Sequence, residues 1–211
     1  MRARGLDHWL MRGLSLQEGD RPGNTIRTAR LVLRPLGFRD ARDFYGYAQD
    51  PAVARYVLWD PHTSLMQTRS ILRGLIADSH LEGLHTLAIT LRESGRMVGT
   101  IGLVNRDRQN MTAEVGFSLA RDCWGRGLMT EALTAYLRYL FALGDINRVE
   151  AQHDALNPAS GAVMQKAGMQ KEGRLNGRVR YKGRTADVLL YAALRDAWLA
   201  SHQEGDKTGS P

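Results

Sequence analysis

The order of strand and helix patterns along the chain predicts an α/β fold. Three consecutive strand patterns, at residues 84–91, 97–105 and 111–120, are separated by turn residues, which indicates an antiparallel meander. The third pattern leads through Gly125 and Gly127 into a helical pattern whose apolar residues recur at intervals of three or four. A meander that runs directly into an amphipathic helix indicates helices packed on a sheet.

Before the meander, the sequence indicates one strand and two helices. Residues 26–35 alternate in hydrophobicity and end at a proline, as a strand does. Residues 38–49 are expected to form a short helix that the Asp-Pro pair at 50–51 stops. Thr63 can cap a longer helix that runs through Glu82.

After the meander, strands and helices alternate. The expected elements are a helix at 128–143, a strand at 148–155, a helix from Asn157 to Gly168, and strands at 169–181 and 185–194. Asn157 suits an N-cap and Pro158 the first helical position, while Lys182-Gly183 suits a hairpin turn. The whole chain therefore predicts about seven strands and about four helices.

Length and composition indicate a globular protein with one folded domain. The chain has 211 residues, of which 43% are hydrophobic and 24% charged. Residues 25–200 should form the domain and residues 201–211 a flexible polar tail. Residues 1–24 should form an N-terminal extension, in which Gly13, Gly19, Pro22 and Gly23 break up a short amphipathic helical pattern. No apolar run approaches the roughly 20 residues of a membrane span, and no signal peptide is evident, so we expect a cytoplasmic protein without membrane contact. The lone Cys123 excludes an internal disulfide and a cysteine-based metal cluster, and no metal is expected.

The glycine pair is interpreted as a pyrophosphate-binding loop. Glycine permits positive φ and a close approach of the backbone, and a helix start leaves unpaired N–H groups and a positive dipole end for an anion. A dinucleotide fingerprint would need glycine at position 130, which is Thr130, and a P-loop would need Gly-Lys-Ser/Thr. The remaining alternative is a turn with two glycines and no ligand.

The stretch from Trp124 to Leu133 resembles the acyl-CoA pyrophosphate loop of the GNAT superfamily of N-acetyltransferases, whose pattern is Gln/Arg-x-x-Gly-x-Gly/Ala. Gly125 and Gly127 match the two small positions. Asp122 departs from the Gln/Arg position, which removes one polar contact and leaves the backbone amides.

Two further motifs strengthen the resemblance, which covers about residues 25–200. The stretch from Asn157 to Gly168 is similar to the Asn-x-x-Ser…Lys-x-Gly element, and residues 28–35 with 59–62 complete the set. The residues of these motifs are most similar to those of the group that contains the ribosomal-protein N-terminal acetyltransferases. The resemblance implies a GNAT fold with a mixed, mostly antiparallel central sheet, acetyl-CoA as cosubstrate, and acetyl transfer to an amine.

The resemblance also implies the residues of the site. The residues expected to bind acetyl-CoA are Trp124, Gly125, Arg126, Gly127, Leu128, Met129, Asn157 and Ser160. Trp59 and His62 resemble the acceptor-binding lip, although both also suit a loop that simply packs on the core. Backbone amides of the strand at 111–120 would bind the oxyanion, as they do in the family.

Glu114 is the candidate general base and Ser160 the candidate acid toward the leaving thiol. Each has a structural alternative, because strand edges often carry a solvated glutamate and a first-turn serine often bonds a local amide. His153 is a weaker candidate base, since a lone histidine there is more often a packed core residue. Cys123 lies just before a helix start, which can lower a thiol pKa and suggests an acyl-cysteine intermediate. Direct transfer is favoured because no partner base lies near Cys123 in the sequence.

The formal net charge of +7 raises the question of an acidic partner. Basic residues cluster near the C-terminus at Arg174, Arg178, Arg180, Lys182 and Arg184. The cluster can contact ribosomal RNA or the phosphates of coenzyme A, or it can be a solvated hairpin face.

Three functions follow from these features. The favoured one is acetylation of a protein N-terminus, with a ribosomal protein as one hypothesis. The alternatives are acetylation of a small amine, such as a polyamine, amino acid or antibiotic, and a non-catalytic acyl-CoA-binding module. The sequence is compatible with a monomer or a homodimer.

Overall fold

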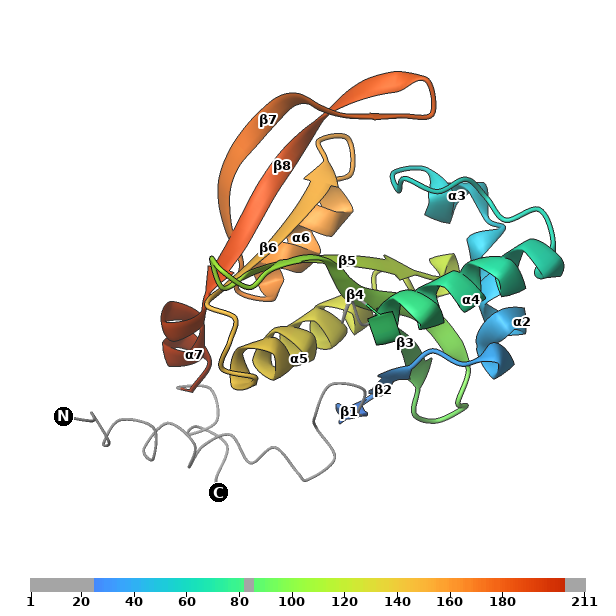
Figure 1. Cartoon of the computed structure of the whole chain (residues 1–211), viewed down its shortest axis with the longest axis horizontal. Coiled ribbons are helices and arrows are strands. Elements are labelled where there is room, and N and C mark those ends of the chain that lie inside the picture. Colours follow the sequence, from blue (N-terminus) through green and yellow to red (C-terminus); the bar gives the residue numbers. More distant parts are fainter. Residues whose placement is uncertain (1–24, 82–85, 204–211) are drawn as a thin grey trace.

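One sheet runs through the molecule, in a computed structural model that describes residues 25–81 and 86–203 (Figure 1). Its strands are β1 (Ile26–Arg27), β2 (Leu31–Pro35), β3 (Thr86–Leu91), β4 (Met97–Asp107), β5 (Thr112–Leu119), β6 (Arg148–Asp154), β7 (Gln170–Tyr181) and β8 (Arg184–Leu194). They lie in the order β1-β2-β3-β4-β5-β6-β8-β7. Among the described residues, only β5 and β6 pair in parallel. The predicted α/β class and mixed, mostly antiparallel sheet are confirmed.

The eighth strand arises because the first predicted strand is interrupted. Residues 26–35 form β1 and β2, joined by a tight turn at 28–30. The Thr28 hydroxyl accepts a hydrogen bond from Leu31 N at 3.0 Å, and Thr28 N donates to Leu31 O at 3.0 Å. Such local bonds compete with a continuous ladder, so the chain folds back and β1 becomes the edge of the sheet.

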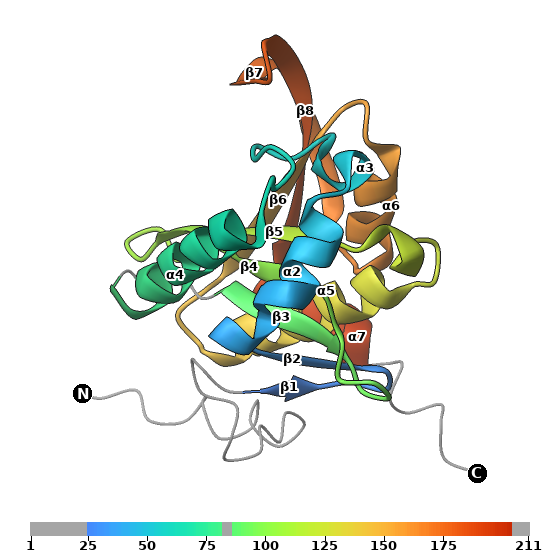
Figure 2. The same ribbon diagram turned by 90° about the vertical axis from the view of Figure 1, so that its right-hand side faces the viewer.

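Six α-helices are present among the described residues, two more than predicted. They are α2 (Ala41–Ala48), α3 (Pro51–Ala54), α4 (Leu65–Leu81), α5 (Leu128–Ala142), α6 (Pro158–Lys166) and α7 (Arg195–Gln203), with short 3₁₀ turns η1 (Phe38–Asp40) and η2 (Arg121–Cys123). On one face α2 packs against α4, and on the other α5 packs against α6 (Figure 2).

The additional helix α3 begins at the pair that was interpreted as a helix stop. The Asp50 side chain accepts a hydrogen bond from Ala52 N at 2.8 Å, and Pro51 occupies the first turn. An Asp-Pro pair therefore ends α2 and caps the next helix at once. The predicted cap of α4 is corrected by one residue, because Gln67 N donates to the Ser64 hydroxyl at 3.1 Å rather than to Thr63.

The other additional helix, α7, packs through Trp198. Its ring lies 5.6 Å from Phe141 between centroids, and its Nε1 donates to Ala167 O at 2.8 Å. The helix includes Ser201 to Gln203, which were expected to belong to the tail. The predicted N-terminal extension at residues 1–24, residue Glu82 and the rest of the tail lie outside the described residues.

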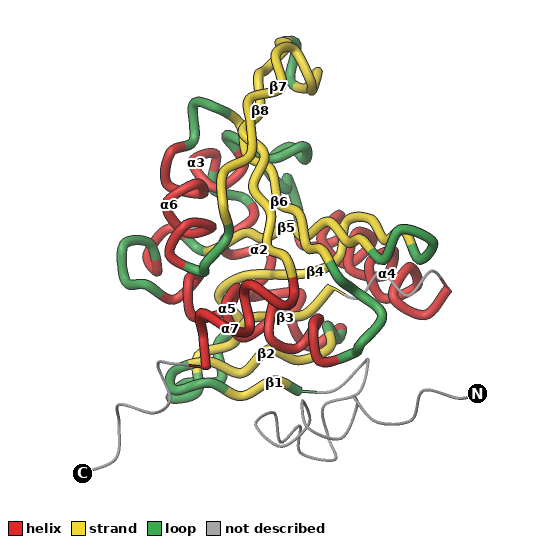
Figure 3. Tube along the Cα trace, turned by 90° about the vertical axis from the view of Figure 1, so that its left-hand side faces the viewer, coloured by secondary structure: helices red, strands yellow, loops and turns green. Residues whose placement is uncertain are grey.

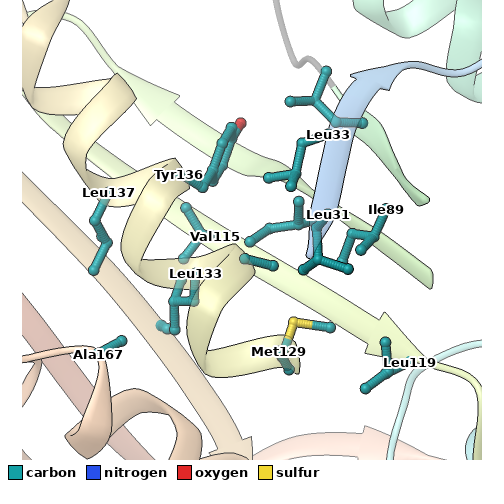
Figure 4. Packing of buried hydrophobic residues seen from close by; sticks show 14 of the residues in the cluster. Leu31, Leu33, Ile89, Val115, Leu119, Met129, Leu133, Tyr136, Leu137 and Ala167 are labelled. Carbon is teal, nitrogen blue, oxygen red and sulfur yellow. The ribbon is translucent and has the colours of Figure 1, made fainter. Parts of the chain in front are cut away.

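The core lies between α5 and the sheet (Figure 4). Leu133 and Leu137 of α5 are fully buried, as are Leu31 and Leu33 of β2. Burial of one such side chain stabilises the fold by about 1.5–3 kcal/mol, so this contact holds the start of α5 firmly against β2.

The β7–β8 hairpin projects beyond the body of the molecule, at the opposite end from β1 (Figure 3). Its turn is the predicted Lys182-Gly183 pair, whose φ values of 49° and 74° fit a two-residue hairpin turn. Lys182 Nζ donates to Ala54 O of α3, so the hairpin tip is tied to the segment between the first two predicted helices.

Candidate active site

The sheet opens between β5 and β6. Their parallel pairing ends at Glu114 opposite Glu150, although β5 continues to Leu119 and β6 to Asp154. On the other side of β5, the pairing with β4 contains a bulge at Val104. A bulge bends the strand that carries it and increases the local twist, and this one in β4 lies at the level where the pairing of β5 with β6 ends. The amides that β5 directs toward β6 beyond Glu114 are therefore left without strand partners.

A cleft of about 580 Å³ lies at this opening. Its walls come from α2, the loop before α4, β4, β5, β6, the start of α6 and the hairpin. Six residues selected from the sequence line it: Trp59, His62, Glu114, His153, Asn157 and Ser160. The expected base, acid and acceptor contacts are thus brought together from three separate segments: β5, the start of α6 and the loop before α4. The glycine loop and Leu128 and Met129 do not line this cleft.

Glu114 shares the cleft wall with Gln152 of β6. Gln152 Nε2 donates to Glu114 Oε1 at 2.8 Å. Within the described part of the chain, the second carboxylate oxygen has no protein partner, and Glu114 is half-buried. The carboxylate is therefore oriented by one bond and keeps one oxygen for an incoming proton. Gln152 was not selected from the sequence; the parallel register of β5 and β6 places it there.

Asn157 and Ser160 stand at the start of α6. Asn157 is the N-cap residue as predicted, but its side chain does not bond a backbone amide of the helix. Its Nδ2 donates instead to Ser160 Oγ at 2.9 Å. The Ser160 hydroxyl hydrogen therefore remains free to donate to another group.

His62 and Trp59 form an aromatic wall of the cleft together with Phe44. The His62 ring lies 5.4 Å from Trp59 and 5.2 Å from Phe44 between centroids, and its Nδ1 bonds Thr68 Oγ1 at 2.9 Å. Burial lowers the pKa of His62, which keeps it neutral. The rim of this wall exposes Leu58, at 71%.

His153 also lines the cleft, but no hydrogen bond joins it to Glu114 among the described residues. Its Nδ1 lies 2.8 Å from Asp154 O, which makes Nδ1 the protonated nitrogen. A Cβ added at Gly161 would meet His153 Nε2 at 2.7 Å, so Nε2 faces the start of α6. Burial lowers the pKa of His153, and Nε2 is buried without a hydrogen-bond partner among the described residues. This geometry supports the packed-residue interpretation of His153.

Asp154 anchors the hairpin at the cleft. It accepts hydrogen bonds from Tyr181 Oη at 2.5 Å, from Leu156 N at 2.8 Å and from Arg184. Burial alone would raise the pKa of Asp154, but these donors outweigh it and the pKa is lowered. Tyr181 and Arg184 lie far along the chain from Asp154, and no local sequence signal connects them.

The glycine loop has the conformation that the sequence predicts. Gly125 and Gly127 have φ values of 71° and 73°, and Gly127 is the N-cap of α5. A Cβ added at Gly125 would have no heavy atom within 4 Å. This open space beside the first amides of α5 is compatible with a bound pyrophosphate. Asp122, the departure from the pattern, pairs with Arg96 at 2.6 Å, which lowers the pKa of Asp122.

Cys123 does not have the environment of a nucleophile. It is fully buried in the 3₁₀ turn before the loop rather than at the first turn of α5. Burial, followed by the neighbouring Asp122 carboxylate, raises the pKa of its thiol. The expectation of a lowered pKa at Cys123 is therefore wrong.

The predicted basic cluster is largely neutralised. Arg174 pairs with Asp187 at 2.5 Å, Arg184 pairs with Asp154, and Lys182 Nζ lies 3.9 Å from Asp60 Oδ1. Of the five residues, the exposed pair Arg178 and Arg180 lack an ion-pair partner among the described residues. A contact with an acidic partner would therefore depend on these two.

Two negative findings apply to residues 25–81 and 86–203. No group of three His, Cys, Asp or Glu side chains is placed to hold a metal ion. No helix in this part is both long and apolar enough to cross a membrane.

Comparisons with known proteins point to one family. A family model described as an acetyltransferase (GNAT) domain matches residues 30–170. The uncharacterized N-acetyltransferase p20 of Bacillus licheniformis is 34% identical over 172 residues, which cover 81% of this chain and 96% of the relative. The ribosomal protein uS5-alanine N-acetyltransferase of Escherichia coli (strain K12) is 29% identical over 191 residues, covering 84% of this chain and 94% of the relative. The solved structure of RimL, a ribosomal L7/L12 α-N-protein acetyltransferase in complex with coenzyme A, has a TM-score of 0.75 at 24% identity and covers 82% of this chain and 99% of that one. The last likeness concerns the fold.

Proposed function

Since the chain belongs to the GNAT family of N-acetyltransferases, we propose that it transfers acetyl from acetyl-CoA directly to the N-terminal α-amine of a protein. The observation that carries the proposal is the opening of the sheet beside Glu114, with Ser160 on the other flank of the same cleft. Acetyl-CoA supplies the acetyl group as a thioester. Gly125, Gly127 and the first turn of α5 would hold its pyrophosphate, and Asn157 would contact its pantetheine arm.

The roles of the protein groups follow from their positions. The unpaired oxygen of Glu114 would take the proton from the amine, directly or through a water, as the amine nitrogen bonds the acetyl carbon. Amides that β5 leaves unpaired would stabilise the oxyanion. The carbon–sulfur bond then breaks, and the Ser160 hydroxyl would pass its proton to the thiolate while it regains one from a water molecule.

An α-amine suits this site better than a lysine or a polyamine. An α-amine has a pKa of about 7.7–8.0, so a sizeable minority is neutral at physiological pH, whereas a lysine amine at about 10.4 is almost wholly charged. The cleft offers one uncommitted carboxylate, Glu114, because Asp154 is bonded by Tyr181 and Arg184. A single carboxylate can pair with a single amine, so the second charged amine of a polyamine would find no carboxylate partner in the cleft.

The rim favours a polypeptide over a small molecule. Leu58 and Val104 line the cleft and are 71% and 56% exposed, which provides apolar contact for residues that follow the amine. Two relatives are named for acetylating ribosomal protein N-termini, so a ribosomal protein is the first acceptor to test.

The test is release of free thiol from acetyl-CoA with a panel of acceptors. Peptides that begin with alanine or serine should be turned over, and polyamines, free amino acids and aminoglycosides should not. Glu114→Gln should lower turnover, while the matched variant Glu150→Gln, on the neighbouring strand and outside the cleft, should retain it. Turnover of small amines alone would favour the small-molecule alternative. Binding of acetyl-CoA without any turnover would favour a binding module.

A further inference from the structure

Arg30, in the turn between β1 and β2, reaches the glycine loop from the N-terminal edge of the sheet. Its Nη1 donates to Arg126 O at 2.9 Å, and its Nε donates to Glu131 Oε2 at 2.6 Å. The same Glu131 accepts from Thr28 Oγ1 at 2.6 Å and from Arg30 N at 2.8 Å. A guanidinium held by a carboxylate and a carbonyl in this way has a fixed orientation.

The bond to Arg126 O decides how the loop presents its amides. In a trans peptide unit the carbonyl and the following N–H point in opposite directions. With Arg126 O held toward Arg30, Gly127 N–H is directed away from Arg30. Glycine tolerates either sign of φ, so the Arg126–Gly127 unit has more than one accessible orientation, and the bond from Arg30 selects one of them.

Arg30 also has a donor to spare. Its Nη2 has no hydrogen-bond partner among the described residues and would lie 3.6 Å from a Cβ at Gly127. Its side chain is 51% exposed, so a ligand at the loop can reach it. The polar side chain that the loop pattern expects at position 122 is here Asp122, whose charge is offset by Arg96.

We propose that Arg30 is part of the acetyl-CoA site: it orients the Arg126–Gly127 peptide and donates from Nη2 to the pyrophosphate, in place of the contact that Asp122 cannot make. The inference rests on the proposed use of acetyl-CoA. It assigns a ligand-binding role to the turn that interrupts the first predicted strand.

The test compares Arg30→Met and Arg30→Lys with Arg92→Met. Arg92 holds the same turn, through bonds from Nη1 to Thr28 O at 2.9 Å and to Ala29 O at 3.2 Å, but no bond joins it to the glycine loop. Calorimetry with coenzyme A and with 3′-dephospho-coenzyme A, which keeps the pyrophosphate and lacks the 3′-phosphate, measures the pyrophosphate contact. Turnover of acetyl-pantetheine, which lacks the pyrophosphate, measures the rest of the site.

Arg30→Met should weaken coenzyme A binding by about tenfold or more, with the loss shrinking as salt is raised, and should leave acetyl-pantetheine turnover unchanged. Arg30→Lys keeps the positive charge but not the paired N–H donors of the guanidinium, and should show a smaller loss of affinity for coenzyme A. Arg92→Met should bind like wild type. An unchanged Kd in both Arg30 variants, or an equal loss in Arg92→Met, would overturn the inference and leave the proposed function standing. Failure of the wild-type protein to bind coenzyme A would overturn both.

Discussion

The glycine loop offers a test in which conformational strain and ligand contact can be separated. Gly125 has a φ of 71°, and Gly144, near the C-terminal end of the same helix, has a φ of 83°. A Cβ added at either position meets no heavy atom within 4 Å. Alanine at either position should therefore destabilise the folded state by the same amount, because its backbone is held in the left-handed region and its side chain meets no steric clash.

This destabilisation is about 1–2 kcal/mol, which corresponds to a fall in Tm of roughly 2–8 °C for a chain of this size. Gly125→Ala and Gly144→Ala should lose stability equally in thermal unfolding. Only Gly125→Ala should weaken acetyl-CoA binding, because its methyl group occupies the space through which a pyrophosphate reaches the backbone amides. Loss of one charged hydrogen bond, worth about 1.5–3 kcal/mol, raises Kd by about 10- to 100-fold.

The assay is calorimetric titration with acetyl-CoA at a temperature where both variants are folded. A wild-type Kd in Gly125→Ala would refute the pyrophosphate assignment. An equal loss of affinity in Gly144→Ala would show that strain, rather than contact with the ligand, causes the effect.

Three other predictions concern the cleft and the hairpin. Glu114→Gln should lower kcat by about 10²-fold, and this loss should shrink as pH rises because more of the amine is then neutral. Ser160→Ala should instead show its largest loss of activity at high pH. Parallel pH–rate profiles of the two variants would reject this division of roles. Asp154→Asn should lower the free energy of unfolding in urea by about 2 kcal/mol at pH 7. Because the pKa of Asp154 is lowered in the folded state, this loss of stability should shrink only as pH falls below about 4. A loss that does not change with pH would contradict the assigned ion pair. Replacing Arg178 and Arg180 with Gln should reduce low-salt co-sedimentation with ribosomes without changing peptide turnover, and equal sedimentation would favour a solvated hairpin face.

Local patterns in the sequence predict most of the fold. The meander and α5 follow from periodicity and turn residues, and the positive φ at Gly125 and Gly127 follows from the motif itself. Two of the errors occur where one residue has two uses. Pro51 ends one helix and begins another, and Thr28 breaks a strand that its hydrophobic pattern would continue.

The parts of the site that could not be predicted depend on long-range register. Gln152 meets Glu114 because β5 and β6 pair in parallel for a short distance and then separate. Arg30 reaches the glycine loop only because β1 turns back at the edge of the sheet. Cys123 was placed near a helix start in the sequence, but the 3₁₀ turn before the loop buries it and reverses its expected pKa shift. Such contacts require the tertiary fold.

The central claim is that the cleft beside Glu114 delivers acetyl to a protein α-amine. The most direct measurement uses isotope-labelled acetyl-CoA and a peptide that begins with alanine and also contains an internal lysine. Tandem mass spectrometry then locates the label. We predict label on the α-amine alone in the wild-type protein, and a greatly reduced yield in Glu114→Gln. Label on the lysine side chain, or equal labelling of both amines, would contradict the claim.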